Sequence, residues 1–200
     1  MESATPTITK RSTMQEVLQA VPSAQRALFS RYHIGGCNSC GYQPEDVLED
    51  VVRRHAITDV DEVVAFIRTA HETDARIQVK PADVASALRG QAPPKLLDVR
   101  TPDEWAIAHL TGATLVDEAL AQQIMQWPKE TPIVLYCHTG QRSLDAASYL
   151  AGHGFTNVRS MTGGIEVWSR EIDTSVPRYE VARDPASGRP TLRPLRSAMS

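Results

Sequence analysis

The sequence has no long hydrophobic run and only three cysteines, and each shortage excludes a class of protein. No apolar stretch approaches the roughly 20 residues that a membrane-spanning helix needs, and the N-terminal residues lack the apolar core of a signal peptide. We therefore expect a cytoplasmic protein with no membrane partner. Three cysteines are too few for a disulfide framework and odd in number, so we expect reduced thiols with a chemical role.

An excess of charge of one sign is also missing. The 21 Lys and Arg residues against 24 Asp and Glu residues give a formal net charge of −3. No basic stripe with interleaved aromatic residues is present, which predicts that nucleic acid is not a partner. The composition, 42% hydrophobic and 22% charged, is ordinary for a globular protein, and 200 residues suffice for one typical domain and a smaller one.

The most informative feature present is a short segment from Cys137 to Arg142, between an apolar run at 133–136 and helix-forming residues at 143–151. This pattern predicts a strand, a tight loop and a helix. In open α/β sheets, ligands bind at the carboxyl ends of the strands, where the first N–H groups of the next helix lack backbone partners. These donors and the helix dipole favour an anion, so Cys137 is expected to be more ionised than a free cysteine.

Each residue of this loop has an expected role. We assign an N–H cradle for substrate to the backbone of His138, Thr139, Gly140, Gln141 and Arg142. Gly140 lets the loop curl where a Cβ would clash, the Thr139 hydroxyl adds a donor, and the guanidinium of Arg142 orients an anion. His138 contributes its backbone N–H, with an imidazolium that stabilises the thiolate as an alternative. The competing interpretation is a buried structural cysteine at the end of a core strand.

Several separate motifs around this loop resemble the rhodanese sulfurtransferase family, over about residues 77–179. The matching segments are an early strand at 96–100, a short helix at 101–105, the segment at 109–113, and a glycine pair and a tryptophan within 161–168. The sequence departs from the family at Ala108 and Thr111, where Gly and Pro are usual. The resemblance implies an α/β fold over residues 73–179, with a parallel sheet of about five strands flanked by helices.

The resemblance also implies a reaction, in which the Cys137 thiolate takes the outer sulfur of thiosulfate or a persulfide donor and becomes a persulfide. A thiol, a protein thiol or cyanide then accepts that sulfur, and no cofactor is required. Asp98 and Arg100, at the end of a neighbouring strand, are candidates for contacts with loop groups near Cys137, although a scaffold salt bridge is the favoured interpretation.

Two other functions compete with sulfur transfer. The active-site loop of cysteine phosphatases resembles this segment but has five residues between its Cys and its Arg. Here only four residues separate Cys137 from Arg142. The tighter ring suits one bound sulfur better than a phosphoryl group. The non-enzymatic alternative is a sulfur carrier without turnover, or an interaction protein linked to redox or metal chemistry.

Residues 1–72 are predicted to form a separate, small all-α domain, because apolar residues recur at helical spacing around positions 14–21, 47–52 and 60–67. A glycine-rich loop between two of these helices carries Cys37 and Cys40 in CxxC spacing. This region resembles a small helical domain of unknown function whose loop also carries CxxC.

Three interpretations of the CxxC pair remain open. As a dithiol, Cys37 and Cys40 accept sulfur from the Cys137 persulfide and release it on forming a disulfide. As a zinc or iron site, the pair needs further ligands, for which His33 and His55 are the candidates. In the third interpretation the thiols only pack or cap.

The C-terminal residues 180–200 form the last region. This segment is rich in proline and shows little apolar periodicity. It is therefore predicted to be an irregular tail.

Overall fold

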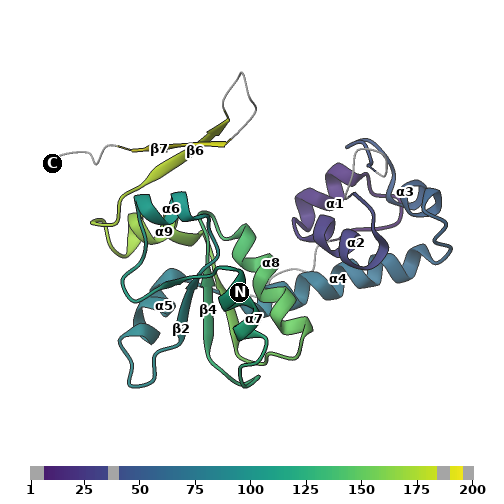
Figure 1. Cartoon of the computed structure of the whole chain (residues 1–200). Coiled ribbons are helices and arrows are strands. Elements are labelled where there is room, and N and C mark those ends of the chain that lie inside the picture. Colours follow the sequence, from purple (N-terminus) through teal and green to yellow (C-terminus); the bar gives the residue numbers. More distant parts are fainter. Residues whose placement is uncertain (1–6, 36–40, 184–189, 196–200) are drawn as a thin grey trace. The chain divides into compact units, whose positions relative to one another are not determined.

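The structure, a computed structural model, describes residues 7–35, 41–183 and 190–195. It divides into two compact units, Met1–Arg76 and Ile77–Ser200 (Figure 1). The predicted boundary at residue 72 lies inside a helix, because α4 runs without a break from Val60 to Ile77. The two units are described separately below.

The first unit is helical, as predicted. Its helices are α1 (Met14–Ala20), α2 (Ala24–Tyr32), α3 (Leu48–Arg54) and α4 (Val60–Ile77). Helix α1 begins at a capping box, in which the Thr13 hydroxyl accepts a hydrogen bond from the Glu16 N–H and the Glu16 carboxylate accepts one from the Thr13 N–H. This reciprocal pair satisfies two N–H groups that have no partner within the helix.

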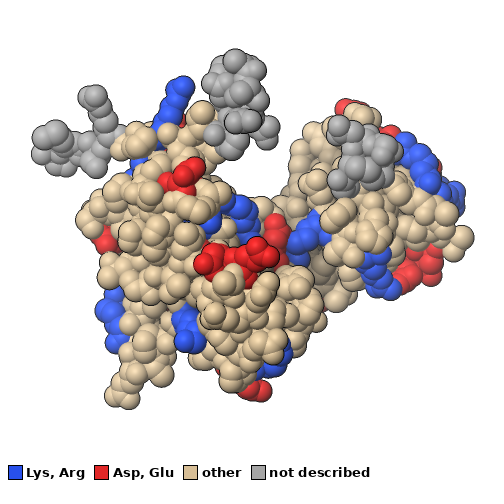
Figure 2. All heavy atoms as spheres, in the orientation of Figure 1, with Lys and Arg blue, Asp and Glu red and all other residues tan. Residues whose placement is uncertain are grey.

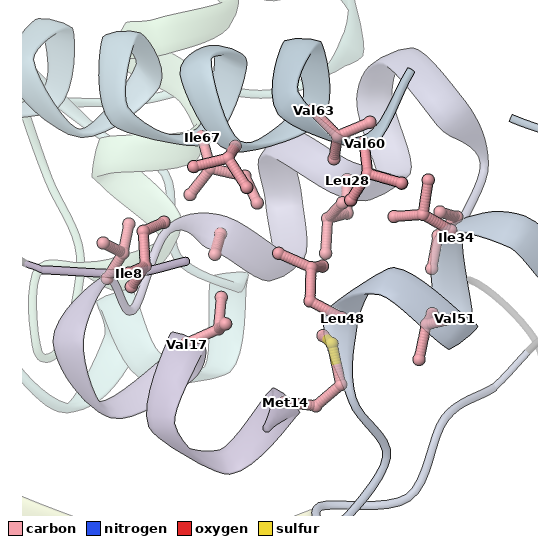
Figure 3. Packing of buried hydrophobic residues seen from close by; sticks show 14 residues of the cluster. Ile8, Met14, Val17, Leu28, Ile34, Leu48, Val51, Val60, Val63 and Ile67 are labelled. Carbon is pink, nitrogen blue, oxygen red and sulfur yellow. The ribbon is translucent and has the colours of Figure 1, made fainter. Parts of the chain in front are cut away.

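The four helices turn their apolar stripes toward one another and share a single core (Figure 3). Side chains from every helix are fully buried in it, including Met14, Val17, Leu28, Leu48, Val51, Val63 and Ile67. Ile8, which precedes the first helix, is buried in the same cluster. A seven-residue helix such as α1 is marginal by itself, so this shared burial is what stabilises the short helices.

The second unit is built on a five-stranded parallel sheet. Its strands are β1 (Gln78–Val79), β2 (Lys95–Asp98), β3 (Thr114–Leu115), β4 (Ile133–Tyr136) and β5 (Val158–Met161). They are ordered β1-β5-β4-β2-β3, and every neighbouring pair is parallel. The predicted α/β fold is therefore confirmed, with β4 at the centre of the sheet.

Helices cover both faces of this sheet (Figure 1). They are α5 (Pro81–Leu88), α6 (Pro102–Ile107), α7 (Glu118–Ile124), α8 (Gln141–Gly152) and α9 (Gly164–Glu171). Val134 and Tyr136 of β4 pack in the core that includes α5 and α9, whereas Ile133 and Leu135 pack in the core that includes α7 and α8. Because successive strand residues point to opposite faces, all four residues of β4 are buried.

The prediction of an irregular C-terminal tail is wrong for most of the residues that the structure describes there. Strands β6 (Tyr179–Arg183) and β7 (Pro190–Pro194) form an antiparallel hairpin. Two prolines flank β7, at its first and last positions, and a two-stranded hairpin tolerates them because both of its strands are edges. Tyr179 and Val181 are two residues apart and share one face of β6. This spacing of two is the signal of a strand, and the high proline content of the segment obscured it.

None of the helices within the described ranges is both long and apolar enough to cross a membrane. On the face of the molecule that Figure 2 shows, acidic and basic side chains are interspersed within each unit. The visible charge pattern agrees with the nearly balanced composition of the sequence.

Candidate functional site

Cys137 lies at the carboxyl end of β4, the central strand, and α8 begins four residues later at Gln141. The strand, loop and helix predicted from the sequence are therefore present. Gly140 adopts φ 94°, a left-handed conformation that residues with a Cβ rarely take, and this turn directs the chain from the loop into α8. The Cys137 residue is 1% exposed, so the candidate nucleophile lies below the surface of the loop.

The sulfur of Cys137 has two donors near it. The backbone N–H of Gly140 donates to Sγ at 3.1 Å, and the Ser143 hydroxyl lies 3.6 Å from the same sulfur. The Ser143 hydroxyl is also 2.9 Å from that of Ser160 on β5, and both serines are buried. Gly140 was a predicted member of the cradle. Ser143 was missed because serine in the first turn of a helix has an ordinary capping role, and Ser160 was missed because it lies on a different strand.

Helix α9 holds the loop from behind. Its first turn binds two loop carbonyls, with Ile165 N donating to Cys137 O at 2.9 Å and Glu166 N donating to His138 O at 3.1 Å. A Cβ on Gly164 would lie 2.3 Å from Cys137 O and 2.4 Å from His138 O. Gly164 therefore allows the main chain of α9 to approach the main chain of the loop closely. The carbonyl oxygens of Cys137 and His138 both point to α9.

Arg142 and Glu104 form a bidentate ion pair. The two terminal nitrogens of Arg142 donate to the two carboxylate oxygens of Glu104, each at 2.7 Å. The Arg142 side chain is 44% exposed and that of Glu104 is 4% exposed. Glu104 was not predicted as a site residue, although its spacing from Thr101 was a signal: the two residues form the capping box of α6.

Glu104 is ionised at neutral pH despite its burial. Burial alone raises the pKa of this carboxyl group, but hydrogen bonds from Arg142, from the Thr101 N–H and from the Tyr179 hydroxyl outweigh it and lower the pKa to about 2. The same pairing raises the pKa of Arg142 above its ordinary value. Both members of the pair are therefore charged over the whole physiological range.

Tyr179, the first residue of the hairpin, joins this network. Its hydroxyl donates to Glu104 Oε1 at 2.8 Å and accepts from Arg100 Nη1 at 2.9 Å. Its ring stacks on His138 with 4.3 Å between ring centroids. Burial is the main reason that the pKa of Tyr179 is raised, so its hydroxyl stays protonated. The contact with Glu104 spans 75 residues of sequence, and no local sequence pattern predicts it.

Asp98 and Arg100 are brought together behind the loop. Their side chains are 0% exposed, and Arg100 Nη2 lies 2.5 Å from Asp98 Oδ2. Arg100 also donates to Ala108 O at 2.7 Å. This is the geometry of a scaffold salt bridge, and it connects to the Cys137 loop through Tyr179.

His138 is mostly buried, with 14% of its side chain exposed, and neutral at pH 7. Burial lowers its pKa, and the positive charges of Arg100 and Arg142 act in the same direction, while Glu104 and Glu166 oppose them. Its Nε2 lies 4.0 Å from a carboxylate oxygen of Glu166. The backbone role predicted for His138 fits this state better than the alternative of a positively charged imidazolium.

A cavity of about 500 Å³ lies beside the loop. Its lining comes from the loop, from α6 and from the hairpin, and comprises Thr101, Asp103, Glu104, His138, Thr139, Arg142, Val181 and Leu192. Three predicted cradle residues therefore face one cavity, while Gln141 begins α8 as an exposed residue.

Cys37 and Cys40 lie outside the described residues, so the predictions of a sulfur relay or a metal site for them stay predictions. His33 is the left-handed residue that ends α2, and His55 follows α3 with its Nδ1 2.9 Å from Val51 O. Within the described part of the chain, no group of three or more His, Cys, Asp or Glu residues is arranged to hold a metal ion.

Comparison with known proteins gives a consistent result for the second unit. The family model of the rhodanese-like domain matches residues 81–171. Over 85 residues the chain is 40% identical to a thiosulfate sulfurtransferase, GlpE, of Pseudomonas entomophila, covering 42% of this chain and 77% of that protein. It is 34% identical to a probable adenylyltransferase/sulfurtransferase, MoeZ, of Mycobacterium tuberculosis, covering 42% of this chain but only 22% of that protein.

Solved structures with a similar fold include a human single-domain sulfurtransferase. It is 22% identical, with a TM-score of 0.42, and the match covers 48% of this chain and 96% of the human chain. A rhodanese-like domain protein from Staphylococcus aureus gives a TM-score of 0.41 at 23% identity, over 46% of this chain and 89% of that chain.

Proposed function

Because the chain belongs to the rhodanese-like sulfurtransferase family, we propose that it moves sulfane sulfur from thiosulfate or a persulfide to a thiol or cyanide through a persulfide on Cys137. The observation that carries the proposal is the contact between the Gly140 N–H and Cys137 Sγ at the head of α8. A main-chain donor aimed at the sulfur stabilises a thiolate and its persulfide without a proton-accepting base.

In the first step the Cys137 thiolate attacks the outer sulfur of the donor. With thiosulfate, the new sulfur–sulfur bond forms as the bond to the sulfonate sulfur breaks, and sulfite leaves with the electron pair. With an organic persulfide, the leaving group is the thiolate of the parent thiol. The negative charge on the enzyme persulfide lies near the N-terminus of α8, where backbone dipoles favour it.

The second step regenerates the thiolate. A thiolate acceptor or cyanide attacks the outer sulfur of the Cys137 persulfide, the enzymic sulfur–sulfur bond breaks, and an organic persulfide or thiocyanate leaves. The buried hydroxyl of Ser143, 3.6 Å from Sγ, supports the returning charge. In each step one bond to the transferred sulfur forms as another breaks, and no external oxidant or reductant takes part, so neither step needs a redox cofactor.

Arg142 has a positioning role in this proposal. Its half-exposed guanidinium lines the cavity beside the loop while Glu104 holds two of its nitrogens. The carboxylate fixes the plane of the guanidinium, and a planar guanidinium binds an anion with directed donors. An anionic sulfur donor is therefore expected to meet the guanidinium of Arg142 in a fixed orientation, with most of its charge neutralised by Glu104.

Intact mass after exposure to thiosulfate, and separately to an organic persulfide, tests the function. The wild type is expected to gain one sulfur atom, which cyanide then removes as thiocyanate. Cys137→Ser is expected to gain none, and Ser143→Ala provides a milder control near the same sulfur. An adduct that persists in Cys137→Ser refutes the mechanism.

Turnover separates an enzyme from a carrier. An enzyme produces many equivalents of thiocyanate or organic persulfide per protein molecule, whereas a carrier stops after one. Phosphate release from a generic phosphate ester without sulfur transfer would favour the phosphatase alternative instead.

A further inference from the structure

The C-terminal hairpin presents one apolar face to the cavity beside the Cys137 loop. Val181 of β6 and Leu192 of β7 are directly opposite in the antiparallel register, so their side chains share a face of the hairpin. Tyr179 lies two residues before Val181 and therefore points to that same face. Both apolar residues line the cavity together with His138, Thr139 and Arg142. The hairpin lies beyond residues 81–171, which the family model matches.

Four contacts anchor the hairpin to the site, three from Tyr179 and one from Arg178. The Tyr179 hydroxyl bonds to Glu104 and Arg100, and its ring stacks on His138. Arg178, just before β6, pairs with Glu166 of α9, the residue whose N–H binds His138 O. Leu195 N donates to Arg178 O at 2.8 Å and closes the base of the hairpin. The apolar wall is thus fixed to the elements that hold the loop.

The wall faces a lining that carries little positive charge. Arg142 contributes +1, Asp103 and Glu104 contribute −2, and His138 is neutral, so the sum over these four residues is −1. The single cation is already bound to a carboxylate through two nitrogens. A doubly charged inorganic anion gains little from this lining, whereas an uncharged organic group gains contact with Val181 and Leu192.

We propose that the hairpin forms a subsite for the organic substituent of a thiol, so that Cys137 exchanges sulfur with organic thiols of uncharged, apolar character in preference to inorganic ions. The inference rests on the proposed sulfur transfer and names its substrate class. In the favoured reaction the thiolate of an organic thiol attacks the outer sulfur of the Cys137 persulfide. The enzymic sulfur–sulfur bond breaks, the Cys137 thiolate leaves with the electron pair, and an organic persulfide is released.

The test loads the full-length protein with one sulfur and measures its discharge to four acceptors: benzyl mercaptan, 2-mercaptoethanol, 2-mercaptoethanesulfonate and cyanide. The double variant Val181→Ser, Leu192→Ser is compared with the wild type for each acceptor, so that intrinsic acceptor reactivity cancels. We expect the double variant to lose about tenfold in kcat/KM for benzyl mercaptan relative to cyanide, mainly through KM. The sulfonate thiol is expected to be the poorest thiol acceptor of the wild type.

Phe29→Ser is the matched control, because Phe29 is an exposed apolar residue of the first unit, 49% accessible. It is expected to leave the acceptor preference unchanged. If the double variant keeps the wild-type ratio of benzyl mercaptan to cyanide, the subsite is refuted while sulfur transfer stands. If the wild-type protein takes no sulfur from any donor, the proposed function itself fails, which is a distinct outcome.

Discussion

The Cys137 loop and the wall around its cavity are built in different ways. The loop is one contiguous segment, held by main-chain bonds to Cys137 O and His138 O and by a glycine at the point of closest approach. The wall is assembled from α6, the loop and the hairpin, which meet through Glu104 and Tyr179. The reactive group thus depends on main-chain contacts, both within the loop and from α9, while the surroundings that select its partners depend on side-chain contacts.

This contrast predicts different modes of failure. A loop fixed by main-chain contacts fails when a new atom forces two backbones apart, which is a steric effect. A wall fixed by Glu104, Arg142 and Tyr179 fails when a charge or a hydrogen bond is removed, which is an electrostatic effect. Substitutions in each region therefore distinguish the two designs, and the steric change is expected to be the larger.

Gly164→Ala tests the loop and is expected to have the largest effect. The new Cβ would lie 2.3 Å from Cys137 O, and the residue has φ +57°. The left-handed conformation and the backbone clash together are expected to cost about 3 kcal/mol in the free energy of unfolding. Displacement of the loop is expected to reduce sulfur loading about a hundredfold. Urea unfolding and intact mass after brief exposure to thiosulfate measure the two effects.

Gly152→Ala is the control for this change. Gly152 is helical, and no atom lies within 4 Å of the Cβ that it would gain. Alanine in a helix is more favourable than glycine, so this variant is expected to be as stable as the wild type or slightly more so. Equal losses in the two variants would contradict the role given to the close approach at Gly164.

Glu104→Gln tests the wall through pH. The folded pKa of Glu104, about 2, lies below its unfolded value of about 4.3, so its contribution to stability is present above pH 4.3 and is lost as pH falls toward 2. Because the partner Arg142 is 44% exposed, we expect this contribution to be about 1–2 kcal/mol. The wild type should therefore lose its advantage over Glu104→Gln between pH 4.3 and 2.

Tryptophan fluorescence follows this experiment selectively, because all three tryptophans of the chain, Trp105, Trp127 and Trp168, lie in the second unit. Asp103→Asn is the matched control, since Asp103 is an exposed neighbour of Glu104 that lines the same cavity. It is expected to change stability by less than about 0.5 kcal/mol at every pH. If the difference in the free energy of unfolding between wild type and Glu104→Gln stayed constant across the acid range, the ion pair would not be the source of that stability.

The same contrast explains which features the sequence predicted. The strand, the loop and the start of α8 around Cys137 follow from residues adjacent in sequence, whereas the parallel sheet was implied by the resemblance of several separate motifs to the rhodanese family. Ser160 and Tyr179 were missed because their contacts depend on strand order and on a hairpin that the prolines disguised. Glu104 had a local signal, its capping box, but capping accounts for that spacing without a site.

Tyr179→Phe is the smallest of these changes and isolates one hydroxyl group of the wall. The ring is retained and can still stack on His138, but Glu104 and Arg100 each lose one partner. An uncharged donor removed from a buried network is expected to cost about 1 kcal/mol in the free energy of unfolding. Sulfur loading of Cys137 is expected to fall no more than about twofold, because α9 and Gly140 still hold the loop.

Tyr149→Phe, at a residue that is 58% exposed, should change neither quantity. If Tyr179→Phe instead abolished loading while remaining folded by tryptophan fluorescence, loop and wall would act as one unit, and the division between them would have to be abandoned.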